Sequence, residues 1–108
     1  MITVEQTERA VLFLRDTSAR FGILKGHTVY LDGNLRRVKA MQMIGKDGSL
    51  GDREASAYAS EQYGKALEEL ENSTAEYETL RAQREAAVYL IDMWRSLSSA
   101  QKQGIQLD

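Results

Sequence analysis

The sequence predicts an all-α protein, an elongated helical hairpin of two long helices that self-associates into a helical bundle or ring. The chain of 108 residues contains no proline, although average usage would give about five, and proline interrupts helices. Apolar residues recur every three or four positions along two long stretches, which is the spacing of one helix face. One glycine-rich loop, residues 45–51, separates these stretches. We therefore predict a single helical domain over residues 1–108.

The first helix is predicted to span residues 3–44. Thr3 followed by Gln6 fits a capping box, in which each side chain accepts from the other residue's backbone N–H. A helix of this length would measure roughly 60 Å, which is too long for the rest of the chain to cover, so a hairpin and contacts between copies are expected. Its apolar face comprises Val4, Val11, Leu14, Ser18, Phe21, Leu24, Thr28, Leu31, Leu35 and Val38.

A β-hairpin over residues 28–38 is the competing prediction for part of this helix. Two β-prone segments flank the pair Asp32-Gly33, which is a strong signal for a two-residue hairpin turn. The apolar spacing continues through this pair without a change of phase. That continuity favours one long helix.

The second half of the chain is predicted to hold a short helix at residues 53–59, with Asp52 as its cap, and a long helix at 61–103. Ser60 caps the long helix and Gly104 ends it. The apolar face of this helix widens toward its end, which is typical of a helix buried on more than one side. In so small a chain we expect copies of the chain to supply that burial. The apolar face comprises Tyr63, Leu67, Leu70, Thr74, Tyr77, Leu80, Ala87, Val88, Ile91, Trp94 and Leu97. Its predicted oligomer interface comprises Tyr77, Leu80, Val88, Ile91, Trp94 and Leu97.

The net charge of −2 conceals a segregation of charge along the chain. Residues 1–51 contain eight Lys and Arg against five Asp and Glu, whereas residues 52–80 contain two against eight. The basic cluster at the end of the first helix and in the loop comprises Arg36, Arg37, Lys39 and Lys46. We predict that it binds nucleic-acid phosphate, the alternative being that these cations only complement the helix dipole. Tyr30 is the one aromatic residue interleaved with the cluster, so base stacking is not indicated.

Three arginines, Arg81, Arg84 and Arg95, lie on or beside the apolar face of the last helix. Salt bridges between helices that set their register are the preferred interpretation. The alternative is that these arginines line a channel and bind an anion.

The sequence offers no catalytic residues, cofactor site or metal site that we can identify, and we predict that the protein is not an enzyme. It has no cysteine, and His27 is its one histidine, so neither a thiolate metal site nor a histidine cluster is available from one chain. Gly45-Lys46 lacks the spacing of a phosphate-binding loop. Glutamates 68, 69, 71, 76 and 78 are interpreted mostly as a solvated helix face.

The order of these segments resembles the UvsY-like recombination mediators of T-even bacteriophages. The resemblance extends over residues 10–105 and rests on the layout, the glycine-rich loop, the acidic helix and the stretches Asn34–Ala40, Tyr77–Arg84, Ile91–Leu97 and Ala100–Ile105. It implies an all-α ring that binds single-stranded DNA, contacts the phage recombinase and the single-strand-binding protein, and helps to load the recombinase. It also implies DNA contacts at Arg36, Arg37 and Lys39, and a main assembly surface from Val88 to Leu97.

Two functions are therefore expected. The first is a recombination mediator that binds single-stranded DNA as a homo-oligomer, and the alternative is a structural or adaptor coiled coil that binds only protein partners. The longest apolar run, Val11–Leu14, is too short for a membrane span, and the lack of cysteine fits a reducing compartment. We therefore expect a cytoplasmic protein, in the bacterial host if the resemblance holds, with no membrane partner.

Overall fold

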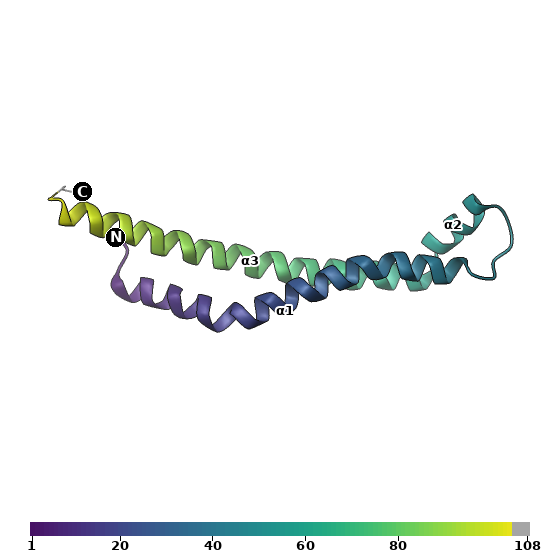
Figure 1. The fold of residues 1–108 in the computed structure, drawn as a ribbon, viewed down its shortest axis with the longest axis horizontal. Helices are drawn as coiled ribbons and strands as arrows, with labels where there is room; N and C mark the ends of the chain where they lie inside the picture. The colour runs from purple at the N-terminus through teal and green to yellow at the C-terminus, as the bar shows by residue number, and fades with distance from the viewer. Residues whose placement is uncertain (105–108) are drawn as a thin grey trace. The chain divides into compact units, whose positions relative to one another are not determined.

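The computed structural model describes residues 1–104 and contains three helices, α1 (Val4–Met43), α2 (Leu50–Tyr58) and α3 (Glu61–Lys102) (Figure 1). Helices account for 88% of the described residues, against roughly a third in an average protein. The chain divides into two compact units. The terminal unit comprises Met1–Phe21 and the chain from Thr79 onward, and the central unit comprises Gly22–Glu78. In each unit a segment of α1 packs antiparallel to a segment of α3, so the predicted all-α hairpin of two long helices is confirmed.

The start of α1 has the predicted capping box. The backbone N–H of Thr3 donates to Oε1 of Gln6 at 2.9 Å, and the backbone N–H of Gln6 donates to Oγ1 of Thr3 at 3.1 Å. Two N–H groups that a helix start leaves without partners are thereby satisfied.

The pair Asp32-Gly33 lies within α1, and the competing β-hairpin over residues 28–38 is wrong. Tertiary packing decides against the local turn signal, because Thr28 and Leu31 both face α3. Leu31 is only 4% exposed, and the Thr28 hydroxyl lies 2.7 Å from the Ser73 hydroxyl. A turn at Asp32-Gly33 would break this face, whereas a helix preserves it at a cost of about 1 kcal/mol for the glycine.

The loop between α1 and α2 is shorter than predicted, since α2 begins at Leu50 rather than at residue 53. Ser49 is the cap of α2 and accepts from the backbone N–H of Asp52 at 3.1 Å, so Asp52 is a first-turn residue and not the cap. Gly45 and Gly48 have φ angles of 75° and 110°, a region that other residues avoid. These two glycines let the chain leave α1 and turn into α2.

The start of α3 follows the prediction, because the Ser60 hydroxyl accepts from the backbone N–H of Tyr63 at 3.2 Å. At the other end Gly104 has a φ of 76°, and its N–H donates to the carbonyl of Gln101 at 3.0 Å. This left-handed residue is the expected stop for a helix.

The core of the central unit is a seam of alternating three- and four-residue steps, which is the heptad pattern of a coiled coil. Its side chains are buried or half-buried and come from both long helices. On α1 they are Leu24, Thr28, Leu31, Leu35 and Val38, and on α3 they are Tyr63, Ala66, Leu70, Ser73 and Tyr77. The Thr28–Ser73 hydrogen bond places a polar layer in the middle of this seam.

The core of the terminal unit has the same periodicity but differs in phase from the predicted apolar face of α1. The seam residues are Thr7, Ala10, Leu14, Thr17 and Phe21 on α1, and Leu80, Arg84, Ala87, Ile91 and Trp94 on α3. The predicted face residues Val4 and Val11 are instead 56% and 50% exposed, and Ser18 is exposed too. On α3, Leu67, Thr74 and Val88 likewise lie outside the seam. The seam uses small side chains on α1 where α3 supplies a large one such as Trp94, because facing helices pack best when large and small residues alternate.

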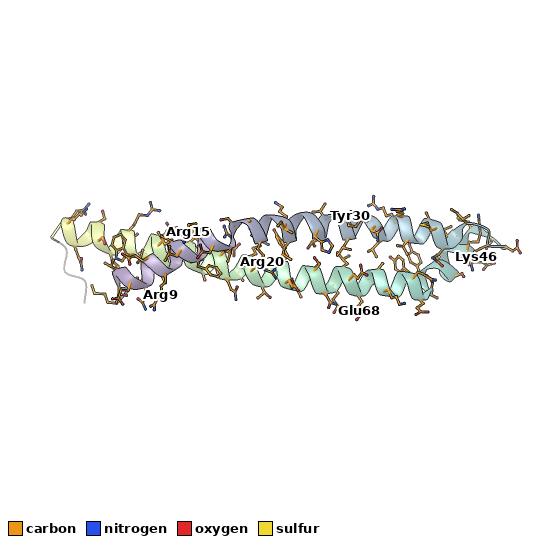
Figure 2. The ribbon with its side chains drawn as sticks, turned by 90° about the horizontal axis from the view of Figure 1, so that it is seen from below. Arg9, Arg15, Arg20, Tyr30, Lys46 and Glu68 are labelled. Carbon is orange, nitrogen blue, oxygen red and sulfur yellow. The ribbon has the colours of Figure 1, made fainter. Side chains whose placement is uncertain are left out.

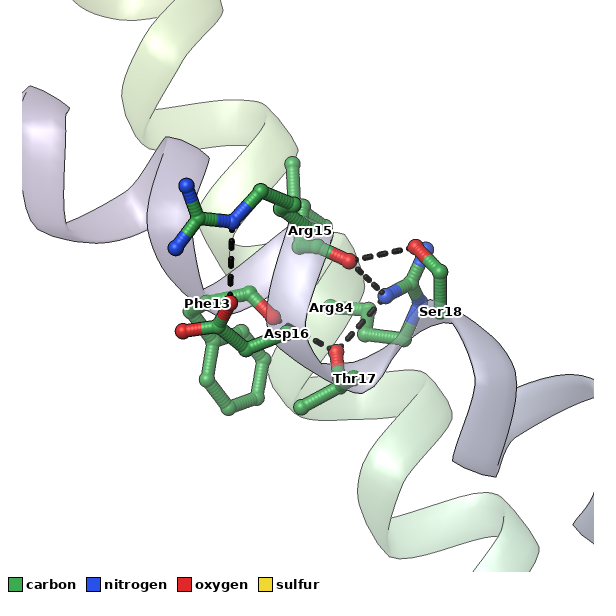
Figure 3. A network of polar contacts seen from close by, with 7 residues as sticks. Phe13, Arg15, Asp16, Thr17, Ser18 and Arg84 are labelled. Carbon is green, nitrogen blue, oxygen red and sulfur yellow. Dashed lines mark hydrogen bonds and ion pairs between the residues drawn. The ribbon is translucent and has the colours of Figure 1, made fainter.

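Arg84 occupies a seam position of the terminal unit and binds α1 directly (Figure 3). Its Nη1 donates to the backbone carbonyl of Leu14 and to Oγ1 of Thr17, both at 2.7 Å, and its guanidinium lies 4.9 Å from the centre of the Phe21 ring. Arg84 therefore contacts α1 through hydrogen bonds and a ring contact, and its role in setting the register of the helices stays a prediction. Arg81 and Arg95 form ion pairs within α3, with Glu85 at 3.3 Å and Asp92 at 2.9 Å.

Replacing two glycines by alanine tests both the helix at Asp32-Gly33 and the turn before α2. Gly33→Ala should raise the free energy of unfolding by about 0.5–1 kcal/mol, because Gly33 is helical and an added Cβ meets nothing within 4 Å. Gly48→Ala should lower it by about 1–2 kcal/mol, since the new Cβ would also lie 3.3 Å from that of Asp52. Urea unfolding followed by far-UV circular dichroism measures both changes. If Gly33→Ala lowered the free energy of unfolding, the result would contradict a continuous helix over residues 28–38.

Arg84→Ala should lower the free energy of unfolding by about 2–3 kcal/mol, because hydrogen bonds from a charged group contribute more than neutral ones. The matched control is Arg95→Ala, an exposed arginine paired within its own helix, which should cost about 0.5 kcal/mol or less. In a double-mutant cycle, Arg84→Ala and Thr17→Val should be coupled by about 0.5 kcal/mol or more. Additive effects in that cycle would show that the Arg84–Thr17 contact does not stabilise the hairpin.

Candidate nucleic-acid interface

The four predicted cations lie at one end of the central unit. Arg36 and Arg37 are exposed on α1. Lys46 is exposed in the loop that follows α1 (Figure 2). Within residues 1–104 none of these three makes an ion pair. Their charges are therefore available to an external anion.

The helix dipole does not account for this cluster. The last turn of α1 contains no basic residue, and the interaction of a cation with a helix dipole fades within that turn. Arg36 and Arg37 lie well before the last residue, Met43, and Lys46 lies beyond it. The helix dipole therefore does not explain the position of these cations, and phosphate binding stays a prediction.

Lys39 differs from the other three cations because it connects α1 to α2. Its Nζ lies 3.6 Å from Oε1 of Glu54 and 4.7 Å from the centre of the Tyr58 ring. The interaction with the Tyr58 side chain raises the pKa of Lys39 above its ordinary value of 10.5; partial burial opposes the rise, and Glu54 adds to it. Lys39 is accordingly fully charged at neutral pH and half-buried between the two helices.

A hollow of about 590 Å³ lies beside these residues. Arg36 and Lys39 line it from α1, Tyr58 from α2 and Tyr63 from α3. The two tyrosine rings meet edge to face, with centres 5.2 Å apart and planes at 80°. Asp32, Leu35, Ala40 and Met43 complete the lining.

The structure therefore brings two of the predicted cations, Arg36 and Lys39, to two tyrosines that the sequence analysis did not assign to the site. Arg37 and Lys46 do not line the hollow. The expectation that base stacking is not indicated counted only Tyr30, the aromatic residue closest in sequence. The short helix predicted after the loop could have indicated that Tyr58 and Tyr63 belong to the site. A helix there returns the chain to α1 and brings the two tyrosines close to Arg36 and Lys39.

The predicted oligomer interface lies partly inside the chain. Leu80 is buried, and Tyr77, Ile91, Trp94 and Leu97 are half-buried, while Val88 is 43% exposed. The terminal unit nevertheless has exposed apolar side chains next to its seam. Val4, Val11 and Leu12 line a hollow of about 560 Å³ together with Trp94, and Tyr89 is 70% exposed.

Other residues considered for chemistry lie on the surface. His27 is exposed beside Glu69 and Glu76 of α3. The five glutamates between residues 68 and 78 are all exposed. The part of the chain that the structure describes contains no group of three or more acidic or histidine side chains placed to hold a metal ion. Among the same residues, no helix combines the length and the apolar content that crossing a bilayer requires.

Comparison of this chain with protein-family models, with curated proteins and with solved structures finds no match. The function proposed below is therefore argued from the residues of this chain.

Proposed function

We propose that this protein is a recombination accessory protein that binds single-stranded DNA as a homo-oligomer and helps to load a recombinase onto it. The observation that supports the proposal best is a group of exposed cations in the central unit. There Arg36, Arg37 and Lys46 are exposed and make no ion pair with a described residue. Arg36 also lines the hollow that contains Lys39, Tyr58 and Tyr63.

In this proposal the protein positions a strand and performs no bond chemistry. Cations that contact phosphates release counterions, and this release gives affinity without sequence preference. Three free cations per chain are too few for strong binding by one copy. Several copies on one strand raise the affinity steeply, because each additional contact becomes intramolecular.

Exposed apolar side chains of the terminal unit support self-association. Val4, Val11 and Tyr89 are 56%, 50% and 70% exposed, and an apolar patch of this kind is a common site of protein contact. The exposed apolar residues of the terminal unit, with Val88 among them, are where we propose that copies meet.

The partners and the location follow from the resemblance to UvsY-like mediators and belong to the same proposal. They are a phage recombinase, a single-strand-binding protein and the cytoplasm of a bacterial host. The exposed basic residues Arg36 and Arg37, at the positions that match the DNA contacts of that family, support this proposal.

A structural or adaptor coiled coil that binds only proteins is the second candidate. The exposed apolar residues at the loop end of the central unit favour it, since Ile44 and Leu50 are 76% and 58% exposed. An apolar patch of this kind is a common site of protein contact. Binding of single-stranded DNA separates the two functions.

The double substitution Arg36→Ala, Arg37→Ala should weaken binding of an oligothymidylate by at least about 10-fold at low salt. The slope of log K against log salt should fall by about 1.4 per chain, since each phosphate contact on a single strand contributes about 0.7. Fluorescence anisotropy at salt concentrations from about 50 to 200 mM measures both quantities. The control is Arg15→Ala, Lys25→Ala, which removes two exposed cations outside the cluster. Equal affinity of the wild type and the cluster variant would contradict phosphate binding by this cluster.

Sedimentation velocity or light scattering should give a mass several times that of one chain. Val88→Lys should lower that mass, because a lysine would be buried without a partner between copies. Ser99→Lys is the matched control, since Ser99 is an exposed polar residue of the same helix, and it should leave the mass unchanged. A monomeric wild type would remove the avidity argument.

A further inference from the structure

We infer that the hollow between α1, α2 and α3 is a subsite for one unpaired nucleotide, with its base against the Tyr58–Tyr63 pair and its phosphate on Arg36 and Lys39. This inference rests on the proposed function, because it assigns residues to one step of single-strand binding. It adds an aromatic contact to a site that was otherwise only electrostatic. It also predicts that the protein distinguishes bases from bare phosphates.

The two tyrosines have the exposure that stacking requires. Tyr58 is 50% exposed, Tyr63 is half-buried, and both line the hollow, so part of each ring is open to a ligand. Their edge-to-face contact at 5.2 Å holds both rings in place, which reduces the entropy lost when a base binds. Aromatic side chains beside cations are the usual platform of proteins that bind single strands without strong sequence preference.

The volume and the boundaries of the hollow suit a nucleotide. Its volume of about 590 Å³ lies within the range of small-ligand pockets, about 300–1,000 Å³. Tyr58 and Tyr63 contribute aromatic rings to its lining, and Arg36 and Lys39 contribute cations. A base in a duplex is already stacked and paired, so it cannot enter such a hollow without leaving its neighbours. The subsite should therefore favour single strands.

Glu54 is the internal group that a phosphate must displace from Lys39. Its carboxylate lies 3.6 Å from Nζ, which is an ion pair without a short hydrogen bond, and its side chain is 40% exposed. A pair of this kind contributes little to stability. A phosphate can therefore take the place of Glu54 while Lys39 stays over the Tyr58 ring.

The test compares an oligothymidylate with an abasic oligonucleotide of the same length, which keeps the phosphates and lacks the bases. The wild type should bind the oligothymidylate on the order of 10-fold more tightly. Tyr58→Leu, Tyr63→Leu should remove this preference and leave binding of the abasic strand nearly unchanged. Tyr30→Leu, which replaces an exposed tyrosine of α1 outside the hollow, should keep the preference. Circular dichroism confirms that each variant is folded.

The outcomes separate the subsite from the proposed function. Equal wild-type affinity for the two strands overturns the subsite, and phosphate contacts by Arg36, Arg37 and Lys46 then remain as the basis of binding. The same conclusion follows if Tyr30→Leu removes the preference as fully as the double tyrosine variant does. Failure of the wild type to bind either strand at low salt overturns both the subsite and the proposed function. Glu54→Gln should raise affinity for both strands by about 2-fold or more, and a lower affinity would contradict competition between Glu54 and phosphate.

Discussion

The narrow seam between α1 and α3 is the constraint on which the other properties of this protein depend. Two helices can cover only one face of each other, and the large side chains of the seam, such as Trp94 and Tyr63, are therefore only half-buried. No large side chain among the described residues is fully buried. Hydrophobic burial within one chain is therefore modest, and many apolar residues remain on the surface. The exposed apolar residues of the terminal unit, such as Val4 and Val11, follow from this limited burial.

Polar layers in the seam are expected to fix the register of the two helices and to lower the stability of the hairpin. Arg84 in the terminal unit and the Thr28–Ser73 pair in the central unit each use a position where a leucine would bury more apolar area. A polar residue at a seam position is a known means of fixing register in coiled coils. Each layer is satisfied by a partner from the other helix, so it avoids the cost of an unpaired polar group.

Features set by neighbouring residues could be predicted from the sequence, and features set by distant residues could not. The Thr3–Gln6 box and the Ser60 cap depend on groups three residues apart, and both were found. The helix through Asp32-Gly33 was predicted because its apolar period extends over many turns. The phase of the terminal unit was missed because Val4 and Val11 are more apolar than Thr7 and Ala10, while the choice between these two faces depends on the side chains of α3. The tyrosines beside Arg36 were missed for the same reason, because only the return of the chain through α2 brings them there.

The two polar layers also restrict how the length of this protein can change. Thr17 and Thr28 are eleven residues apart on α1, and their partners Arg84 and Ser73 are eleven residues apart on α3. A shift of α1 by one heptad would place Ala10 or Leu24 opposite Arg84 and leave its guanidinium without a hydroxyl acceptor. Between the two layers, a deletion or insertion in one long helix that is not matched in the other would therefore break one of the layers. The loop after Met43 lies outside both layers, so a change in its length does not alter the pairing of Arg84 or Thr28.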